Sequence, residues 1–285
     1  MSSTALRQRR RSTGHARPTS PALRRRVTRR LPRPGRILAV ILFATLVGAG
    51  VALVAGPWLR VERVAHAGAR YTAAATLDQI LDAYRGRPLL ALDSRAIAEQ
   101  VSGLPAVATV EVTAVLPDEL RVTVAEKTPA LTWVTSAARL VGAADGTLIA
   151  ELPRDTELSA DLAALPTVDD RRRRSRLLTV GDVLPPSELE TARRLLAVDP
   201  AMLGSKATQL SVRVDAEFGF ILVSSQPAWQ AAFGFYGLDP SAGAADVDGR
   251  IEQQVAAIRT LLAAHAETSV RWVDARNPGK VYWAP

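Results

Sequence analysis

The sequence contains no cysteine, so no disulfide supports the fold and no thiol is available for catalysis or metal binding. Histidine is almost as scarce, and after residue 36 only His66 and His265 remain. A protein metal site draws several His, Cys or carboxylate ligands at a regular spacing, and the sequence offers no such set. We therefore expect no metal and no cofactor.

Catalytic motifs are also missing. The chain has no Gly-x-Ser-x-Gly, no Ser-x-x-Lys and no glycine-rich phosphate loop. The paired carboxylates Asp169 and Asp170 stand beside five arginines, Arg171 to Arg174 and Arg176, and this cationic setting favours two ionised carboxylates over a split acid and base pair. We predict that the protein is not an enzyme.

Acidic residues are absent from the first 36 residues, which contain twelve arginines. The other 249 residues hold 24 basic and 28 acidic groups, so the net charge of +8 comes from this tail. Large apolar residues are nearly absent before Leu31, and we expect a disordered tail. A nucleic-acid binder normally spreads positive charge over a folded face. A membrane-tethered nucleic-acid binder acting through the tail stays an alternative.

One long hydrophobic run is present, from Ile37 to Ala55, and it carries no charge over nineteen residues. A helix of this length spans about 28 Å, close to the hydrocarbon core of a bilayer. Arg36 and Arg60 flank the run, and the indole of Trp58 suits the headgroup layer, so these three residues are the expected membrane interface with phospholipid. The run is too long for a signal peptide and lacks a good cleavage site.

The positive-inside rule then gives the sidedness of the chain. Residues 1–36 are predicted to lie in the cytoplasm, residues 37–55 to form a single transmembrane helix in the plasma membrane, and residues 60–285 to lie outside the cytoplasm.

Residues 60–128 have the pattern of a small α+β domain. The pattern predicts a strand at Val61 to His66, a helix at Ala73 to Tyr84 capped by Thr72, and a helix at Ser94 to Val101 capped by Asp93. Two alternating stretches around Pro117-Asp118 then predict a hairpin. The order is β-α-α-β-β, with two helices covering one face of a three-stranded sheet.

This order resembles a POTRA (polypeptide-transport-associated) domain, and its short sequence motifs resemble those of the FtsQ/DivIB family of bacterial division proteins. Four pieces carry the resemblance, in order: Val61-Glu62-Arg63-Val64 with Gly68; Gly86-Arg87-Pro88-Leu89-Leu90-Ala91-Leu92-Asp93; Leu104-Pro105-Ala106-Val107; and Leu116-Pro117-Asp118-Glu119-Leu120 leading to Glu126-Lys127-Thr128-Pro129-Ala130. POTRA domains of outer-membrane machines come in series before a barrel, whereas one domain behind one anchor favours the division family.

Residues 131–285 form the second expected domain. Strands are predicted around 140–141, 148–149, 210–214, 218–223, 230–235, 269–273 and 279–283, with the 218–223 strand central. Residues 154–176 are expected to be a solvated loop, with binding of an anionic envelope polymer as its functional alternative. Ser187 and Glu190 have the spacing of a capping box, and a long helix is predicted at Asp248 to His265.

The resemblance extends to this domain, and it implies a β-meander with helices that continues the POTRA sheet. The ending Trp272-Val273-Asp274-Ala275-Arg276-Asn277-Pro278-Gly279-Lys280-Val281-Tyr282-Trp283-Ala284-Pro285 is similar to the family's C-terminal segment. Residues 231–237 and the loop 238–249 depart from the family pattern, so element boundaries are uncertain there.

A chain of this kind is suited to binding, because an exposed edge strand offers unpaired N–H and C=O groups to a partner. Lys280 to Trp283 is the candidate edge. The resemblance implies a divisome scaffold that binds FtsB- and FtsL-like proteins and is concentrated at the division septum. It places partner contacts on Arg276, Gly279, Val281, Tyr282 and Trp283 and on the helix face of Ile251, Val255, Ile258 and Leu262. An envelope polymer-binding protein or hydrolase is the other alternative.

Overall fold

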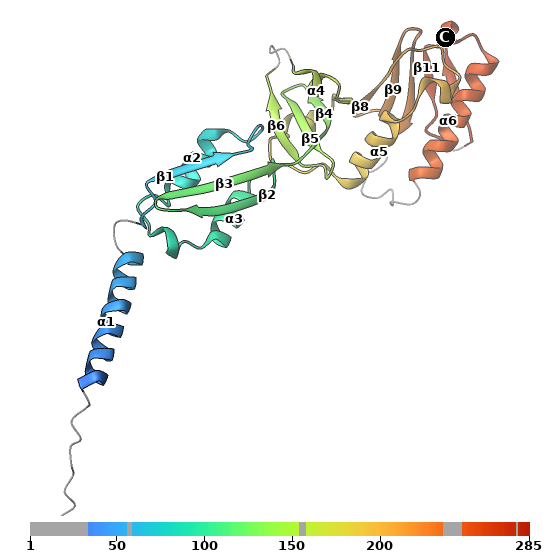
Figure 1. Cartoon of the computed structure of the whole chain (residues 1–285). Coiled ribbons are helices and arrows are strands. Elements are labelled where there is room, and N and C mark those ends of the chain that lie inside the picture. Colours follow the sequence, from blue (N-terminus) through green and yellow to red (C-terminus); the bar gives the residue numbers. More distant parts are fainter. Residues whose placement is uncertain (1–33, 56–58, 154–157, 236–246, 278) are drawn as a thin grey trace, which may run out of the picture. The chain divides into compact units, whose positions relative to one another are not determined.

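The computed structural model describes residues 34–55, 59–153, 158–235, 247–277 and 279–285 (Figure 1). The chain divides into two compact units, residues 1–50 and residues 51–285. The tail that was predicted to be disordered lies outside the described residues. So does the loop at 238–246, at the second place where the sequence departs from the family pattern.

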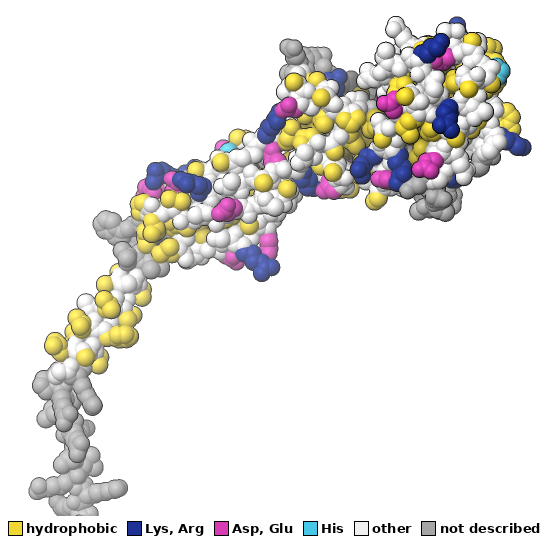
Figure 2. Space-filling model, turned by 45° about the vertical axis from the view of Figure 1, so that its right-hand side comes forward, with side chains coloured by type: hydrophobic (Ala, Val, Ile, Leu, Met, Phe, Trp, Pro, Cys, Tyr) yellow, Lys and Arg dark blue, Asp and Glu magenta, His cyan; other side chains and the backbone are white. Residues whose placement is uncertain are grey.

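The hydrophobic run forms helix α1, Pro34–Ala55. Hydrophobic side chains cover this helix (Figure 2), and those described between 37 and 52 are exposed. The single hydroxyl of the run, Thr45, donates a hydrogen bond to the carbonyl of Ile41 at 2.9 Å. Considering only the residues that the structure describes, no helix combines the length and the apolarity needed to cross a membrane.

The predicted β-α-α-β-β order of the small domain is confirmed. Its strands form a separate sheet in the order β1-β3-β2, with β1 parallel and β2 antiparallel to β3. Leu77 and Leu81 of one helix and Ile97 and Val101 of the other pack on the inward face of β3. The elements are β1 (Arg63–Ala67), α2 (Ala74–Asp82), the 3₁₀ helix η2 (Leu89–Ala91), α3 (Ser94–Ser102), β2 (Val107–Val115) and β3 (Glu119–Glu126).

The two predicted helix caps have different outcomes. Asp93 caps α3, because its Oδ1 accepts hydrogen bonds from the backbone N–H groups of Arg95 and Ala96 at 3.0 and 3.2 Å. The cap predicted at Thr72 is wrong: the N-cap of α2 is Ala73. The Thr72 N–H instead donates to the carboxylate of Glu126, at 2.7 Å, which fixes the chain before the helix to the end of β3.

The second domain is built on a nine-stranded sheet in the order β12-β11-β10-β9-β8-β7-β4-β5-β6. Three of its pairs are parallel, β4–β7, β7–β8 and β10–β11, so it is more than a meander. The strands are β4 (Pro129–Thr135), β5 (Arg139–Ala143), β6 (Leu148–Leu152), β7 (Thr167–Asp170), β8 (Leu210–Asp215), β9 (Gly219–Ser225), β10 (Ala228–Gly234), β11 (Trp272–Asp274) and β12 (Tyr282–Ala284). The expectation that this sheet continues the POTRA sheet is wrong, because the two sheets are separate.

Helices pack on this sheet around one hydrophobic core. The central strand β9 is buried at Gly219 to Leu222, as its two apolar faces predicted. The helices are α4 (Ala160–Ala163), η3 (Arg173–Leu177), α5 (Pro186–Leu196), η4 (Pro200–Leu203), α6 (Val247–Ala264) and η5 (Glu267–Ser269). Figure 1 shows α5 and α6 beside the strands.

Two expectations for this domain are wrong. The capping box fails because α5 starts two residues earlier than expected, with Pro185 at the N-cap and Pro186 in the first turn. Glu190 pairs with Arg194 at 2.8 Å instead of reaching back to Ser187. The prediction of a solvated loop at residues 154–176 is also wrong for the described part of this segment. Residues 158–176 contain α4, β7 and most of η3, and Asp170 is fully buried.

Candidate protein-docking edge

The C-terminal strand β12 is the last strand of the large sheet. Among the strands that the structure describes, it pairs only with β11, in an antiparallel register that places Val273 opposite Trp283 and Asp274 opposite Tyr282. Its other edge therefore offers backbone N–H and C=O groups. All residues of β12 are exposed, and the side chains of Tyr282 and Trp283 are among the large hydrophobic side chains that contact solvent. The predicted edge, Lys280 to Trp283, overlaps this strand, which begins two residues later at Tyr282.

A tight reversal between β11 and β12 positions this strand. Gly279 has φ +72°, in the left-handed region that favours glycine, and no atom would meet an added Cβ within 4 Å. The N–H of Lys280 donates to the carbonyl of Asn277 at 3.1 Å. The sequence therefore forms this turn locally and returns the chain along β11.

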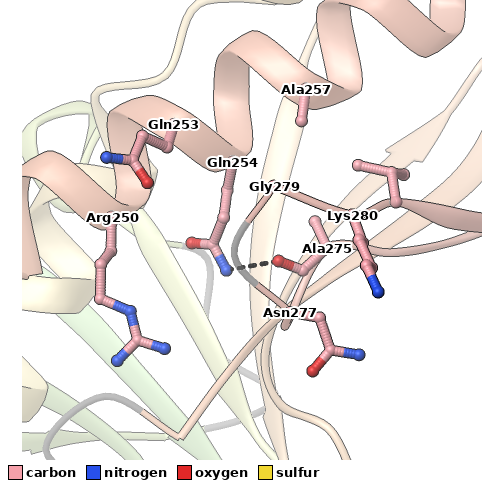
Figure 3. Close-up of a pocket in the computed structure, with 9 residues that line it drawn as sticks. Arg250, Gln253, Gln254, Ala257, Ala275, Asn277, Gly279 and Lys280 are labelled. Atoms are coloured by element: carbon pink, nitrogen blue, oxygen red, sulfur yellow. Dashed lines mark hydrogen bonds between the residues drawn. The ribbon is translucent and has the colours of Figure 1, made fainter.

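Gln254 fixes the base of the turn from helix α6. Its buried side-chain NH₂ donates to the carbonyls of Phe233 and Ala275, at 2.8 and 2.7 Å, and so joins the ends of the parallel strands β10 and β11 (Figure 3). Sequence reasoning missed this residue, although a signal was present. Gln254 is three residues after Ile251 and four before Ile258, so a polar side chain interrupts the apolar stripe of the helix.

The hollow between α6 and the turn is too small for a substrate. Its interior is about 10 Å³, which is room for about one water molecule. Figure 3 shows Arg250 and Gln253 extending from the helix and Asn277 and Lys280 from the turn. These four polar side chains are exposed, which suits contact with another macromolecule.

Arg276 lies beside this edge and is held within the chain. Its guanidinium forms two hydrogen bonds to the carboxylate of Asp274, at 2.9 and 2.7 Å, and lies 4.9 Å from the ring centre of Phe218. The hydrogen bonds from Arg276 hold the pKa of Asp274 below its ordinary value, and those to Asp274 raise the pKa of Arg276. Phe218 in turn meets Trp272 edge to face at 4.6 Å. The guanidinium is thus a preorganised cation rather than a free one.

Trp283 contacts the end of α6. Its ring lies 4.4 Å from the ring of His265, at an angle of 40°. This contact leaves 38% of Trp283 exposed and gives the indole a fixed position. Gly279, Tyr282 and Trp283 are exposed, whereas Val281 packs partly against the core of the domain.

The four predicted helix residues have a different placement. Ile251, Val255, Ile258 and Leu262 are buried in the core of the domain, with at most 8% of each exposed. They form the inner face of α6 and hold it on the sheet. Surface for a partner on this helix comes from its other faces.

The POTRA part of the chain matches a known protein family. Residues 59–127 match the family model of the POTRA domain, FtsQ-type. The chain carries an FtsQ-type POTRA domain. This finding supports the resemblance to the FtsQ/DivIB family. A search of curated proteins found no match.

FtsQ-type POTRA domains are non-catalytic scaffold domains. In this one, His66 Nε2 lies 3.2 Å from the carboxylate of Asp78 on α2. In the described part of the chain, no three His or carboxylate side chains gather as they would around a metal ion. The hydrolase alternative needs a carboxyl whose pKa is raised. In the described part of the chain, hydrogen bonds lower the pKa values of Glu126, Asp145, Glu267 and Asp274.

Of the three residues predicted at the membrane interface, the structure describes one side chain. The backbone of Arg60 forms an isolated antiparallel β-bridge with Pro88 of the FtsQ-type domain, and its side-chain Nη1 donates to the carbonyl of Gly86 at 3.4 Å. The side chains of Arg36 and Trp58 lie outside the described residues. The interface role of all three stays a prediction.

Proposed function

We propose that this protein is a bitopic membrane scaffold of the bacterial division machinery that acts by recruitment rather than catalysis. The FtsQ-type POTRA domain supports a role in division. The observation that carries the binding part is the open edge of β12 with its exposed aromatic side chains. The proposed partners are FtsB- and FtsL-like division proteins.

The edge suits a partner that adds a strand. Such a partner would pair with the free backbone groups of β12, and its side chains would meet Tyr282 and Trp283. Tyrosine and tryptophan supply much of the binding energy in protein interfaces. Arg276 is held close by through Asp274, and Lys280 adds a second cation, so an acidic side chain of the partner would have a fixed counterpart.

The membrane part of the proposal rests on the apolar run of α1. Its nineteen uncharged residues follow an arginine-rich tail, so residues 1–36 would stay in the cytoplasm and residues 60–285 would lie outside it. We place the protein in the plasma membrane, concentrated at the septum, where the scaffold would help control wall synthesis.

Trp283→Glu tests the edge in the full-length protein in detergent, with the extracytoplasmic segments of FtsB- and FtsL-like proteins as ligands. The variant places a carboxylate where the indole contacts a partner, and we expect about 30-fold weaker binding, the loss of a central aromatic contact. A chain ending at residue 278 should lose binding completely. Affinity can be measured by biolayer interferometry.

Leu90→Glu is the matched control, because Leu90 is 51% exposed and lies on η2, in the other domain. It should bind like the unaltered protein. Equal binding by the unaltered protein, Trp283→Glu and the shortened chain would exclude β12 as the docking edge. If the unaltered protein bound neither ligand, the proposed partners would be wrong.

A further inference from the structure

A second surface stands apart from β12, in residues 173–183 between η3 and α5; we name it the arginine ridge. Three large apolar side chains are exposed in this short stretch, Leu177 at 81%, Val183 at 60% and Val180 at 41%. Outside α1, Leu177 is the most exposed large hydrophobic residue of the described chain. Apolar side chains grouped at a surface mark contact sites for other molecules.

Buried ionic contacts fix the first end of the ridge. Arg172, 6% exposed, binds the carboxylates of Asp170 and Glu188 at 2.6 and 2.8 Å. Burial disfavours the charged guanidinium, but these two carboxylates outweigh it and raise the pKa of Arg172. The buried hydroxyl of Ser175 donates to the carbonyl of Arg172 at 2.7 Å. η3 is therefore anchored from below while its outer side chains face solvent.

Backbone pairing with the start of β6 fixes the other end. The Gly181 N–H donates to the Leu148 carbonyl at 2.8 Å, and the Leu148 N–H donates to the Asp182 carbonyl at the same distance. The Leu184 N–H donates to Gly146 at 2.9 Å. This backbone pairing thus holds the apolar side chains in the exposed position, and the segment cannot fold back onto the protein to cover them.

Two arginines on the ridge lack a carboxylate partner. The side chain of Arg173 makes no hydrogen bond or ion pair with any residue that the structure describes, and Arg176 donates to the neutral hydroxyl of Ser136 at 2.7 Å. In a 3₁₀ helix, residues three apart lie one above the other, so these two cations share a face of η3. Their neighbours Arg171 and Arg174 are neutralised by Asp169 and Glu188.

We propose that the arginine ridge is a docking site for an acidic polypeptide segment of a partner protein. Carboxylates of that segment bind Arg173 and Arg176, and its apolar side chains cover Leu177, Val180 and Val183. A segment with both acidic and apolar side chains is complementary to this surface, because it can match the charge of the two arginines and cover the adjacent apolar group. This site is separate from β12 and does not depend on the function proposed for that edge.

Other anionic partners fit the ridge less well. Asp182 lies between Val180 and Val183 in sequence and accepts hydrogen bonds from the N–H and hydroxyl of Thr179. Insertion of the valines into an anionic bilayer would carry this carboxylate to the lipid phosphates. A charged polymer would leave the apolar side chains uncovered. A polypeptide can place a neutral or donor group opposite Asp182.

The test is selection of random twelve-residue peptides on the full-length protein in detergent, with removal of peptides that also bind Arg173→Glu/Arg176→Glu. We expect the remaining peptides to be enriched in Asp and Glu interspersed with Leu, Ile or Phe. Absence of acidic enrichment would overturn the proposal. So would a pool that, before this removal, consisted of peptides that bind the double variant as well as the unaltered protein.

Affinities of the selected peptides then separate the two contributions. We expect at least tenfold weaker binding for Arg173→Glu/Arg176→Glu and for Leu177→Ser/Val183→Ser, with weaker binding as salt rises. Arg95→Glu, at an exposed position on α3, is the charge control and should change affinity less than twofold, as should Trp283→Glu. Binding of phosphatidylglycerol vesicles or heparin that the ridge variants abolish, without any acidic peptide, would replace this proposal by a lipid or polymer site.

Discussion

Arg172 is the side chain that compensates the charges of two buried carboxylates, and we expect it to contribute strongly to the free energy of unfolding. Asp170 also accepts a hydrogen bond from the indole N–H of Trp133 at 3.1 Å, so the ionic cluster reaches into the core. Arg172→Ala would leave the charges of Asp170 and Glu188 buried without the guanidinium. We expect a loss of about 3–5 kcal/mol in the free energy of unfolding, measured by urea denaturation.

Arg171→Ala is the control for that measurement. Arg171 pairs with Asp169 at 2.8 Å, but both side chains are largely in water, so the loss should be within about 0.5 kcal/mol. Equal losses in the two variants would show that the buried cluster contributes no more than a surface pair.

The same residues show the limit of sequence reasoning at this scale. The composition of a run of two aspartates and four arginines predicts a solvated loop. In the structure, side chains alternate along β7, so that Val168 and Asp170 point into the protein. The partner Glu188 is sixteen residues further on, and no local pattern joins it to Arg172. Asp93 could be identified as a cap because its hydrogen bonds are local, with Arg95 and Ala96.

At the scale of elements, the hairpin of β9 and β10 depends on one glycine. Gly219 has φ +72°, and a Cβ there would lie 2.0 Å from the carbonyl oxygen of Gly234. Gly219→Ala must therefore move one strand, in addition to the cost of left-handed backbone for alanine. We expect a loss of at least about 3 kcal/mol in the free energy of unfolding, measured by urea denaturation.

Gly204→Ala separates these two costs. Gly204 also has a left-handed backbone, φ +64°, in the same domain, but the nearest atom to an added Cβ is the Cγ of Arg259 at 3.9 Å. This variant should lose only about 1–2 kcal/mol. The interpretation of Gly219 as a close backbone approach fails if the two substitutions cost the same.

Periodicity predicted most elements, and it did not predict how distant ones pair. The alternation at Phe218 to Val223 indicated a central strand. The apolar spacing from Ile251 to Leu262 is that of a buried helix face, although the resemblance placed partner contacts there. The parallel pairs β4–β7 and β10–β11 join segments separated by helices, and side-chain alternation is the same whichever neighbour a strand has.

At the scale of the whole chain, the break between the two sheets falls within a few residues. β3 ends at Glu126 and β4 begins at Pro129, which has no N–H to donate to a continued ladder. Burial opposes the ionised form of Glu126, but the N–H groups of Tyr71, Thr72 and Arg70 outweigh it and lower its pKa. The resemblance implied one continuous sheet, and no local pattern indicated that the Glu126 carboxylate binds backbone N–H groups 54 to 56 residues earlier in the chain.

Lys127 joins the FtsQ-type domain to the second domain across this break. Its Nζ donates to the carboxylate of Asp145 at 2.9 Å and to the hydroxyl of Thr147 at 2.8 Å. The hydrogen bond from Lys127 lowers the pKa of Asp145 to about 2, against the opposing effect of burial. A carboxyl with a lowered pKa stabilises the folded state fully above its unfolded pKa of about 4, and this contribution is lost as the pH falls toward 2.

Asp145→Asn should therefore lower the free energy of unfolding at pH 7 by less than about 1 kcal/mol, since Asp145 is half exposed. The difference between the variant and the unaltered protein should shrink as the pH falls from 4 to 2. Other carboxyls titrate in both proteins, so their effects cancel in that difference, measured by urea denaturation at each pH. Asp161→Asn, which removes a more exposed pair with Arg70 at 3.6 Å, should give a difference near zero throughout. A constant difference for Asp145→Asn from pH 7 to pH 2 would show that its charge does not hold the two domains together.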